Sequence, residues 1–125
     1  MHRYRLYGVF IDTPIAQAGQ AIDFWSAAFG ATAQADEDGT YHRLDGAVPG
    51  VEIEVQAVDD TPRYHLDIES DDVAAETGRL VALGAEIVAA HARWNVLRAP
   101  GGHLVCVVPV QSDKAFFAAN AKMTQ

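Results

Sequence analysis

The sequence predicts an α+β fold in which two βαβββ modules form a curved mixed sheet around a cup, with the helices on the convex side. Three observations predict it. Strand-like and helix-like segments follow one another in the same order twice, Phe29-Gly30-Ala31 is echoed by Leu83-Gly84-Ala85, and no linker or low-complexity tract divides the 125 residues. We therefore expect one domain, with module one at about 4–58, module two at about 63–109 and a C-terminal helix at 112–122.

Module one begins with a strand at residues 4–11, which is rich in aromatic and β-branched side chains and ends at Asp12-Thr13-Pro14. A helix follows, because apolar residues recur at intervals of three to four and Gly30 supplies a stop. The apolar stripe of this helix is Ala18, Ile22, Trp25 and Phe29. Three strand segments complete the module, at residues 31–35, 40–44 and 51–58.

Module two repeats this order from a strand at residues 64–69. Ser70-Asp71-Asp72 then offers capping oxygens and negative charge to the start of a second helix. The apolar face of that helix is traced by Val73, Glu76, Leu80 and Leu83. Three further strands are expected at residues 86–90, 94–97 and 104–108, before the final helix outside the repeat.

The charge balance is acidic, with 9 Lys+Arg against 17 Asp+Glu and a formal net charge of −8. Such a surface repels phosphate backbones and anionic lipid, so we expect no nucleic-acid or membrane partner. The single Cys106 forms no internal disulfide, and neither a signal peptide nor a long apolar stretch is evident. These features predict a cytoplasmic protein whose partner is a small-molecule ligand.

Five segments spread over almost the whole chain carry a family resemblance. They are Val9-Phe10-Ile11-Asp12, Ala21-Ile22-Asp23-Phe24-Trp25, Arg63-Tyr64-His65-Leu66-Asp67-Ile68, Leu80-Val81-Ala82-Leu83-Gly84-Ala85 and Pro100-Gly101-Gly102-His103. Through them the chain resembles the vicinal oxygen chelate superfamily of glyoxalases, bleomycin-resistance proteins and extradiol dioxygenases, and most closely its small glyoxalase-like bacterial members. The resemblance implies the fold; members share a scaffold but differ in chemistry.

The resemblance also implies where a metal would bind, because enzymes of this superfamily hold one divalent ion through the first and last strand of each module, usually by His, Glu, His and Glu. His65 stands at one of these four slots. The other three fall at or near Gly8, Gln56 and Cys106, with Glu54 two residues before Gln56 on the same face. A glycine, an amide, an imidazole and a thiol make a poor site for hard divalent cations. We expect no metal or other cofactor; one divalent metal held by Glu54 and His65 is the minority alternative.

Alternation along residues 64–69 places two sets of side chains on opposite faces of the strand. The polar set should face the cup, and the apolar set should lie under the helices. The polar set is His65, Asp67 and Glu69, and the apolar set is Tyr64, Leu66 and Ile68. We interpret His65 and Gln56 as polar ligand anchors, with Glu54 beside them; a histidine simply hydrogen-bonded within the sheet is the structural alternative.

Three aromatic residues, Phe10, Tyr41 and Trp94, are predicted to give the cup the apolar wall that small-molecule sites usually have, whereas Trp25 belongs to the core. Cys106 is expected to be a small buried hydrophobe beside them. The alternative for Cys106 is a nucleophile with His65 as its base.

We therefore expect a small-molecule binding protein of the glyoxalase and bleomycin-resistance type, without the usual metal. Whether it is also an enzyme stays open. The alternative is a metal-dependent lyase, isomerase or dioxygenase acting on a substrate with vicinal oxygens. A subunit whose main task is to pair as a homodimer is a third reading, which no feature of the sequence decides.

Overall fold

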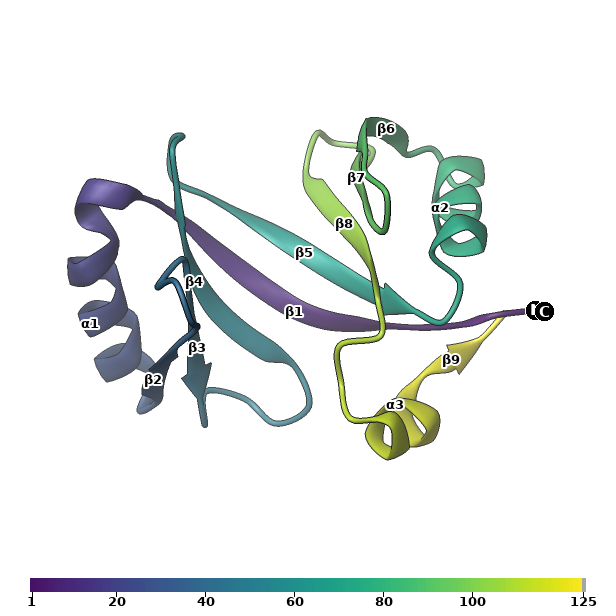
Figure 1. Cartoon of the computed structure of the whole chain (residues 1–125). Helices are drawn as coiled ribbons and strands as arrows, with labels where there is room; N and C mark the ends of the chain where they lie inside the picture. The colour runs from purple at the N-terminus through teal and green to yellow at the C-terminus, as the bar shows by residue number, and fades with distance from the viewer. Residues whose placement is uncertain (125) are drawn as a thin grey trace. The chain divides into compact units, whose positions relative to one another are not determined.

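The computed structural model describes residues 1–124, and within them the chain is α+β, with nine strands and three α-helices (Figure 1). The β-α-β-β-β order occurs twice, as the sequence predicts. The chain divides into two compact units. Gly8–His65 is called here the α1 unit, and Met1–Tyr7 together with the chain from Leu66 onward is called the α2 unit. Strands β1 (Arg3–Pro14) and β5 (Arg63–Ser70) each contribute residues to both units.

The α1 unit contains a short 3-10 turn (Ile15–Gln17), helix α1 (Ala18–Phe29) and strands β2 (Thr32–Ala35), β3 (Tyr41–Asp45) and β4 (Glu52–Val58). The strand order is β2-β3-β4-β1, in which β4 pairs with β1 in parallel and the other pairs are antiparallel. Helix α1 ends at Gly30, whose φ of 61° is left-handed, as the glycine signal predicts. The buried core is Ile11, Leu44 and Val55, and Ile22 and Trp25 of α1 pack against it. The prediction that Trp25 packs in the core is confirmed.

The α2 unit contains helix α2 (Val73–Ala82) and strands β6 (Glu86–Ala90), β7 (Asn95–Arg98) and β8 (Leu104–Pro109). The strand order is β5-β8-β7-β6, and only the β5–β8 pair in it is parallel. Asp72 caps α2 by accepting a hydrogen bond from the backbone of Ala75 at 3.0 Å. The core of the unit is Ala85, Leu97, Val105 and Val107, with Ile68, Val73 and Leu80 packed against it.

The C-terminal helix is shorter than the sequence predicts. Helix α3 spans Lys114–Asn120, and the chain then forms strand β9 (Lys122–Met123), which pairs antiparallel with Arg3 and Tyr4. The helix begins late because Asp113 is its N-cap, accepting from the backbone N–H groups of Ala115 and Phe116. It ends early because Ala121 is extended, which starts the pairing with β1.

Strand β1 is longer than predicted, and this changes the place of Asp12. The sequence suggests that the strand ends at Asp12-Thr13-Pro14, but the parallel pairing with β4 continues through Asp12↔Gln56, Thr13↔Ala57 and Pro14↔Val58. Pro14 is the last residue of the strand. Asp12 therefore lies in the sheet and not in a turn.

The prediction for the apolar face of β5 is right only at its C-terminal end. Ile68 packs against the core, but Tyr64 is 60% and Leu66 is 40% exposed. A ten-residue helix such as α2 is about 15 Å long, whereas an eight-residue strand spans about 26 Å. The helix is therefore too short to cover the whole strand.

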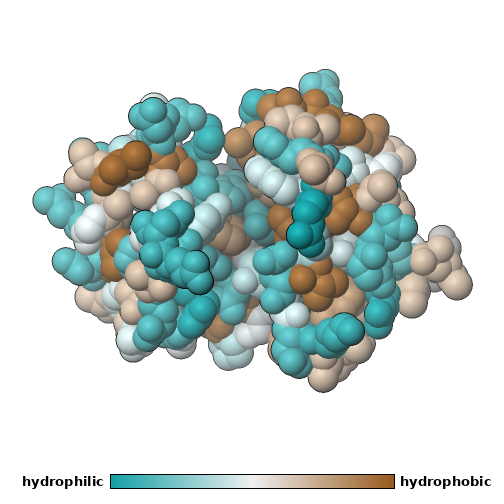
Figure 2. All heavy atoms as spheres, viewed as in Figure 1, coloured by the Kyte–Doolittle hydropathy of each residue, from teal (hydrophilic) through white to brown (hydrophobic). Residues whose placement is uncertain are grey.

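The surface is mixed in character. On the face drawn in Figure 2, hydrophobic side chains lie in small groups among hydrophilic ones. Within residues 1–124, no helix has the length and apolar character needed to cross a membrane.

Candidate functional site

The sheet register of the α1 unit gathers the polar residues of three strands on one face. In β1 and β4 the aligned pairs are Gly8↔Glu52, Phe10↔Glu54 and Asp12↔Gln56, and in β3 and β4 they are Tyr41↔Gln56 and Arg43↔Glu54. Directly paired residues of neighbouring strands point to the same side of a sheet. The alternate residues Ile11 and Val55 belong to the core under α1. The polar residues therefore lie on the face turned away from α1.

His65 is held at this face by Asp12 and Phe10. Its Nδ1 atom lies 2.8 Å from Oδ2 of Asp12. Its ring stacks on that of Phe10, with the centroids 4.8 Å apart and an interplanar angle of 7°. The Phe10 residue is 4% and the Asp12 side chain 3% exposed, but the His65 side chain keeps 12% exposure. Of these three side chains, the imidazole is the one that reaches furthest toward solvent.

Asp12 has an uneven set of partners. Its Oδ2 accepts from His65 and, at 3.4 Å, from Nε of Arg63, whose guanidinium also pairs with Asp60 at 3.1 Å. Its Oδ1 is buried and has no hydrogen-bond partner within residues 1–124. A buried carboxylate oxygen without a partner is unusual, because most buried polar atoms are hydrogen-bonded.

Tyr41, Glu54 and Gln56 surround this pair on the same face. The edge of the Tyr41 ring meets Phe10, with centroids 6.1 Å apart and an interplanar angle of 85°. Gln56 is the direct strand neighbour of both Asp12 and Tyr41. Glu54 is 9% exposed and pairs in register with Phe10 and Arg43. The structure therefore places five of the predicted site residues in one unit: Phe10, Tyr41, Glu54, Gln56 and His65.

The donors of the α1 unit do not fit the divalent metal that the family resemblance implies. At Gly8 a Cβ atom would lie 3.0 Å from the backbone oxygen of Glu52 and 3.2 Å from Cε1 of Phe10, so this slot has no room for a ligand side chain without a shift. Gln56 offers a neutral amide. Among the slots that the resemblance implies, His65 and, two residues from its slot, Glu54 carry a donor of the expected type. We derive no step through a metal.

Trp94 and Cys106, the other two predicted ligand residues, lie in the α2 unit. Trp94 precedes β7 and stacks on His91, with centroids 4.0 Å apart and an interplanar angle of 15°. Cys106 lies on β8 and is the parallel register partner of Asp67. It is only partly buried, so it is less enclosed than a core residue. The roles of both residues stay predictions of the sequence.

Sequence reasoning missed Asp12 and Arg63 as site residues. Asp12 is followed by Thr-Pro, a combination typical of turns, so its place in the strand was not evident. A usable signal did exist: Gly8, Phe10 and Asp12 are separated by two residues each, so a strand extended to Asp12 puts all three on one face. Arg63 has no such signal, because the sequence places it just before the predicted strand at residues 64–69.

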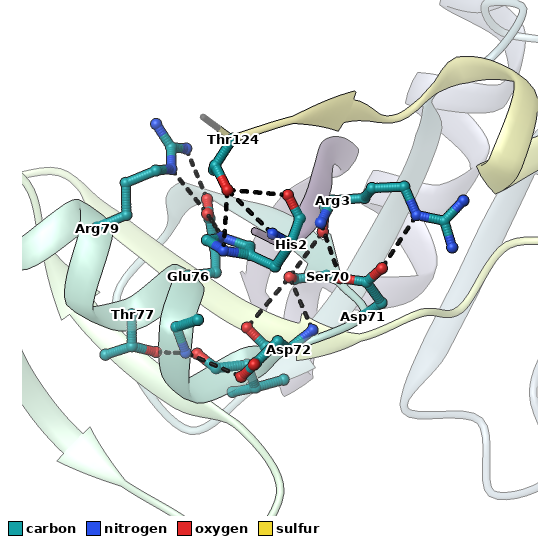
Figure 3. A network of polar contacts seen from close by, with 11 residues as sticks. His2, Arg3, Ser70, Asp71, Asp72, Glu76, Thr77, Arg79 and Thr124 are labelled. Atoms are coloured by element: carbon teal, nitrogen blue, oxygen red, sulfur yellow. Dashed lines mark hydrogen bonds and ion pairs between the residues drawn. The ribbon is translucent and has the colours of Figure 1, made fainter.

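A second buried histidine–carboxylate pair lies in the α2 unit. Nε2 of His2 is 2.7 Å from Oε1 of Glu76, and Arg79 donates to both oxygens of Glu76, at 2.8 and 2.7 Å (Figure 3). Thr124 accepts a hydrogen bond from the backbone N–H of His2 at 3.0 Å. The guanidinium of Arg79 also lies over the Tyr4 ring, 3.9 Å from its centroid. Glu76 therefore ties His2 to helix α2, and Thr124 is joined to His2.

Glu69 is a third fully buried carboxylate, and it too is fully bonded. It accepts from the backbones of Gln111 and Ser112, from the Ser112 hydroxyl and from Nη1 of Arg5, at 2.6 to 2.9 Å. Burial, the largest single effect, acts to raise the pKa of Glu69. The hydrogen bonds from Ser112, Arg5 and Gln111 together outweigh it, so the pKa lies below its ordinary value.

Comparisons with known proteins agree with this architecture. A model of the glyoxalase-like domain family matches residues 8–108. No curated protein matches the chain significantly. A hypothetical protein from Bacillus halodurans C-125 superposes with a TM-score of 0.65 at 12% identity, covering 88% of this chain and 96% of that one.

Two structures of methylmalonyl-CoA epimerase are also similar. The Mycobacterium tuberculosis protein has a TM-score of 0.55 at 22% identity and covers 84% of this chain and 87% of its own. A Streptomyces coelicolor variant in complex with 2-nitronate-propionyl-CoA has a TM-score of 0.57 at 12% identity and covers 86% and 98%. At these identities the likeness shows the fold alone.

Proposed function

Because this chain belongs to the glyoxalase-like domain family of the vicinal oxygen chelate superfamily, we propose that it is a small-molecule binding protein whose α1 unit binds its ligand without a divalent metal. The observation that carries the proposal is the group formed by Asp12, His65 and Phe10. It combines a stacked, oriented imidazole with a buried carboxylate that has one unbonded oxygen. Oriented polar groups beside aromatic rings are the usual composition of small-molecule sites.

Each residue of the proposed site has a distinct part. Phe10 and Tyr41 supply aromatic contact area, since their rings already meet edge to face. His65 and Gln56 are the polar anchors, and Glu54 adds a carboxylate beside them. Asp12 orients His65 and does not itself need to touch the ligand.

The charge of the chain bears on the kind of ligand. The related epimerase binds a CoA derivative, which is a polyanion, but this chain carries a formal net charge of −8. Glu52 and Glu54 lie on the site face, and Arg43, the register partner of Glu54, is itself paired with Asp45. A neutral ligand suits this face better than a polyanion does.

The alternative function is a metal-dependent lyase, isomerase or dioxygenase. One observation favours it: metal-binding histidines often donate their second ring nitrogen to a carboxylate, as His65 does to Asp12. The closed slot at Gly8 and the amide of Gln56 stand against it. We therefore keep it as the outcome that the test must exclude.

The test is metal analysis and ligand binding on one sample, purified without chelator or affinity metal. We expect no stoichiometric metal, and binding of small neutral aromatic molecules that is unchanged by EDTA and weakened by Phe10→Ala. One equivalent of Ni, Mn, Zn or Fe that His65→Ala removes would favour the metal-dependent enzyme. The variant Asp23→Asn is the matched control, because Asp23 is an exposed residue of helix α1 and the site lies on the face turned away from α1.

The proposal extends to location and assembly. We place the protein in the cytoplasm, where a single thiol such as that of Cys106 stays reduced. A homodimer is compatible with the exposed Tyr64 and Leu66. Sedimentation at micromolar concentration tests it, and a monomer there would remove pairing as a function.

A further inference from the structure

We propose that the ligand of the α1 unit carries a hydroxyl group on an aromatic ring, which donates a hydrogen bond to Oδ1 of Asp12 and accepts one from the side-chain amide of Gln56. This inference rests on the proposed function and adds the chemical class of the ligand. For the proposed function Asp12 needs only to orient His65, whereas here its second oxygen contacts the ligand.

Oδ1 of Asp12 is an acceptor that the fold leaves without a partner. The Asp12 side chain is 3% exposed, and both of its contacts fall on Oδ2, from His65 at 2.8 Å and from Nε of Arg63 at 3.4 Å. Oδ1 is buried and has no hydrogen-bond partner within residues 1–124. An ionised carboxylate only accepts, so the group that completes Asp12 has to be a donor. Because a buried polar atom without a partner costs free energy, a ligand that supplies the donor gains affinity there.

The amide of Gln56 stands beside this carboxylate. Asp12 and Gln56 are direct register partners in the parallel pairing of β1 and β4, so their side chains leave the same face of the sheet. Neighbouring strands are about 4.8 Å apart, a spacing at which one ligand atom can lie within hydrogen-bond distance of both side chains. An amide donates through its NH₂ group. The position between the two residues therefore offers one acceptor and one donor.

A hydroxyl group matches this pair. It donates its hydrogen and accepts through its lone pairs, so a single oxygen atom satisfies Asp12 and Gln56 together. A ring N–H can satisfy only Asp12, and an ether oxygen can accept only from Gln56. A ligand carboxylate would bring a second negative charge to Asp12, and an ammonium group would approach the guanidinium of Arg63. The arrangement thus favours a neutral hydroxyl over a charged group.

The residues next to this pair are suited to an aromatic ring. Tyr41 is the register partner of Gln56 on β3, and Phe10 lies two residues before Asp12 on the same face of β1. Their rings meet edge to face, with the centroids 6.1 Å apart. Phe10 is buried, but Tyr41 is only half-buried, so part of its surface can contact a ligand. An aromatic ring that carries the hydroxyl gains further contact area against Tyr41.

Oδ1 is enclosed, so a neighbouring side chain has to turn aside before the hydroxyl reaches it. Gln56 is suited to this, because its long side chain is only half-buried, whereas Asp12 is held by His65 and Arg63. Changes of side-chain rotamer on binding are common, even where the backbone hardly moves. Binding therefore needs a rotation of the Gln56 side chain and no shift of the strands.

The test compares two probes on the full chain with EDTA present, 4-methylphenol and its methyl ether 4-methylanisole. Both have the ring and an oxygen that accepts, but only the phenol donates. We expect the phenol to bind at least about tenfold more tightly, which is the value of one hydrogen bond to a charged group. The carboxyl ¹³C signal of Asp12 should move on titration with the phenol and stay in place with the ether.

Asp12→Asn provides the decisive variant. Its amide oxygen has to stay at the Oδ2 position, where Arg63 donates, so its NH₂ group takes the place of Oδ1. Both probes can accept from this NH₂ group, and the phenol no longer gains from donating. We expect the preference for the phenol to fall to near one, while Asp23→Asn, an exposed position of helix α1, keeps it. Gln56→Leu should weaken both probes and keep the preference.

The outcomes separate the inference from the function on which it rests. If neither probe binds, the proposed function fails and the inference fails with it. If both probes bind equally well, the proposed function stands and the inference is overturned. An Asp12 carboxyl signal that the phenol leaves unchanged also overturns it, and this measurement needs no variant to fold. The same holds if the folded Asp12→Asn variant keeps the preference, or if Gln56→Leu binds both probes as tightly as the unmodified chain.

Discussion

Each unit contains a histidine that contacts a buried carboxylate. The two carboxylates differ in how many of their oxygens are hydrogen-bonded. In the α2 unit, both oxygens of Glu76 are bonded, one to His2 and Arg79 and the other to Arg79 (Figure 3). In the α1 unit, Asp12 bonds through Oδ2 alone, and Oδ1 has no partner within the described chain. A polar group with all its hydrogen bonds made stabilises one structure, whereas a carboxylate oxygen without a partner can still accept a hydrogen bond from a ligand. In our proposal, Glu76 therefore stabilises the fold and Asp12 belongs to the ligand site.

The largest effect on stability is expected from Glu76→Ala. The change leaves Arg79 and the ring of His2 without their shared partner, which costs about 3–5 kcal/mol in a buried pair. Urea unfolding followed by circular dichroism measures it. The control is Asp45→Asn, whose partner Arg43 is 49% exposed, so its loss should stay within about 1 kcal/mol. If the two changes lowered the free energy of unfolding equally, the proposed structural role of Glu76 would be wrong.

Glu69→Gln should have the next largest effect, and one that depends on pH. Because the folded pKa of Glu69 is lowered, its contribution is complete above the ordinary value of 4.5 and is lost as the pH falls from there toward the folded pKa. We expect Glu69→Gln to cost about 1.5–3 kcal/mol at neutral pH, since charge-assisted hydrogen bonds are lost.

The pH dependence gives this prediction its own check. The stability difference between Glu69→Gln and the unmodified protein should shrink as the solution becomes more acidic than pH 4.5. Urea unfolding at several pH values measures it. A difference that stays constant through the acid range would show that the pKa of Glu69 is not lowered in the folded chain.

Gly8→Ala tests whether the β1 slot is closed. The new Cβ would lie 3.0 Å from the backbone oxygen of Glu52, so the strand must shift, at about 1–3 kcal/mol. Gly19→Ala is the matched control, because Gly19 lies in helix α1 with nothing within 4 Å. That change should stabilise the protein by about 0.5–1 kcal/mol. Thermal unfolding that moves both variants in the same direction would contradict the close contact at Gly8.

The smallest change in stability is expected from Asp12→Asn, at about 1 kcal/mol, because Oδ1 has no partner to lose. Glu76→Gln, made alongside it, should cost more stability, because both oxygens of Glu76 are bonded. The comparison fails if Asp12→Asn is the more destabilising of the two in urea unfolding.

The sequence predicts the repeated order of elements because each helix and strand depends on residues that are close together in the sequence. The apolar stripe of α1 and the stop at Gly30 need only neighbouring residues. Gly30 caps the helix and Ile22 and Trp25 pack against the core, whereas Phe29 is 41% exposed. The alternation that placed His65 opposite Tyr64 is local too. Its consequence for burial failed at Tyr64 and Leu66, because the reach of a helix over a strand depends on packing and not on alternation.

The two histidine–carboxylate contacts join residues that are far apart in the sequence, so the sequence alone does not predict them. Asp12 meets His65 across 53 positions, and His2 meets Glu76 across 74. No local pattern marks either pair. The family resemblance identified the His65 position but gave no indication of its partner, since the strand had been expected to end at Asp12.

The most direct measurement follows the rings of His65 and His2 in one ¹H–¹⁵N spectrum, with EDTA present, as 4-methylphenol is added. The account predicts that the His65 signals move in a saturable way and that those of His2 stay in place. If only the His2 signals moved, or if binding were saturable but left His65 unchanged, the account would be contradicted. In it the Asp12–His65 pair belongs to the ligand site and the Glu76–His2 pair stabilises the fold.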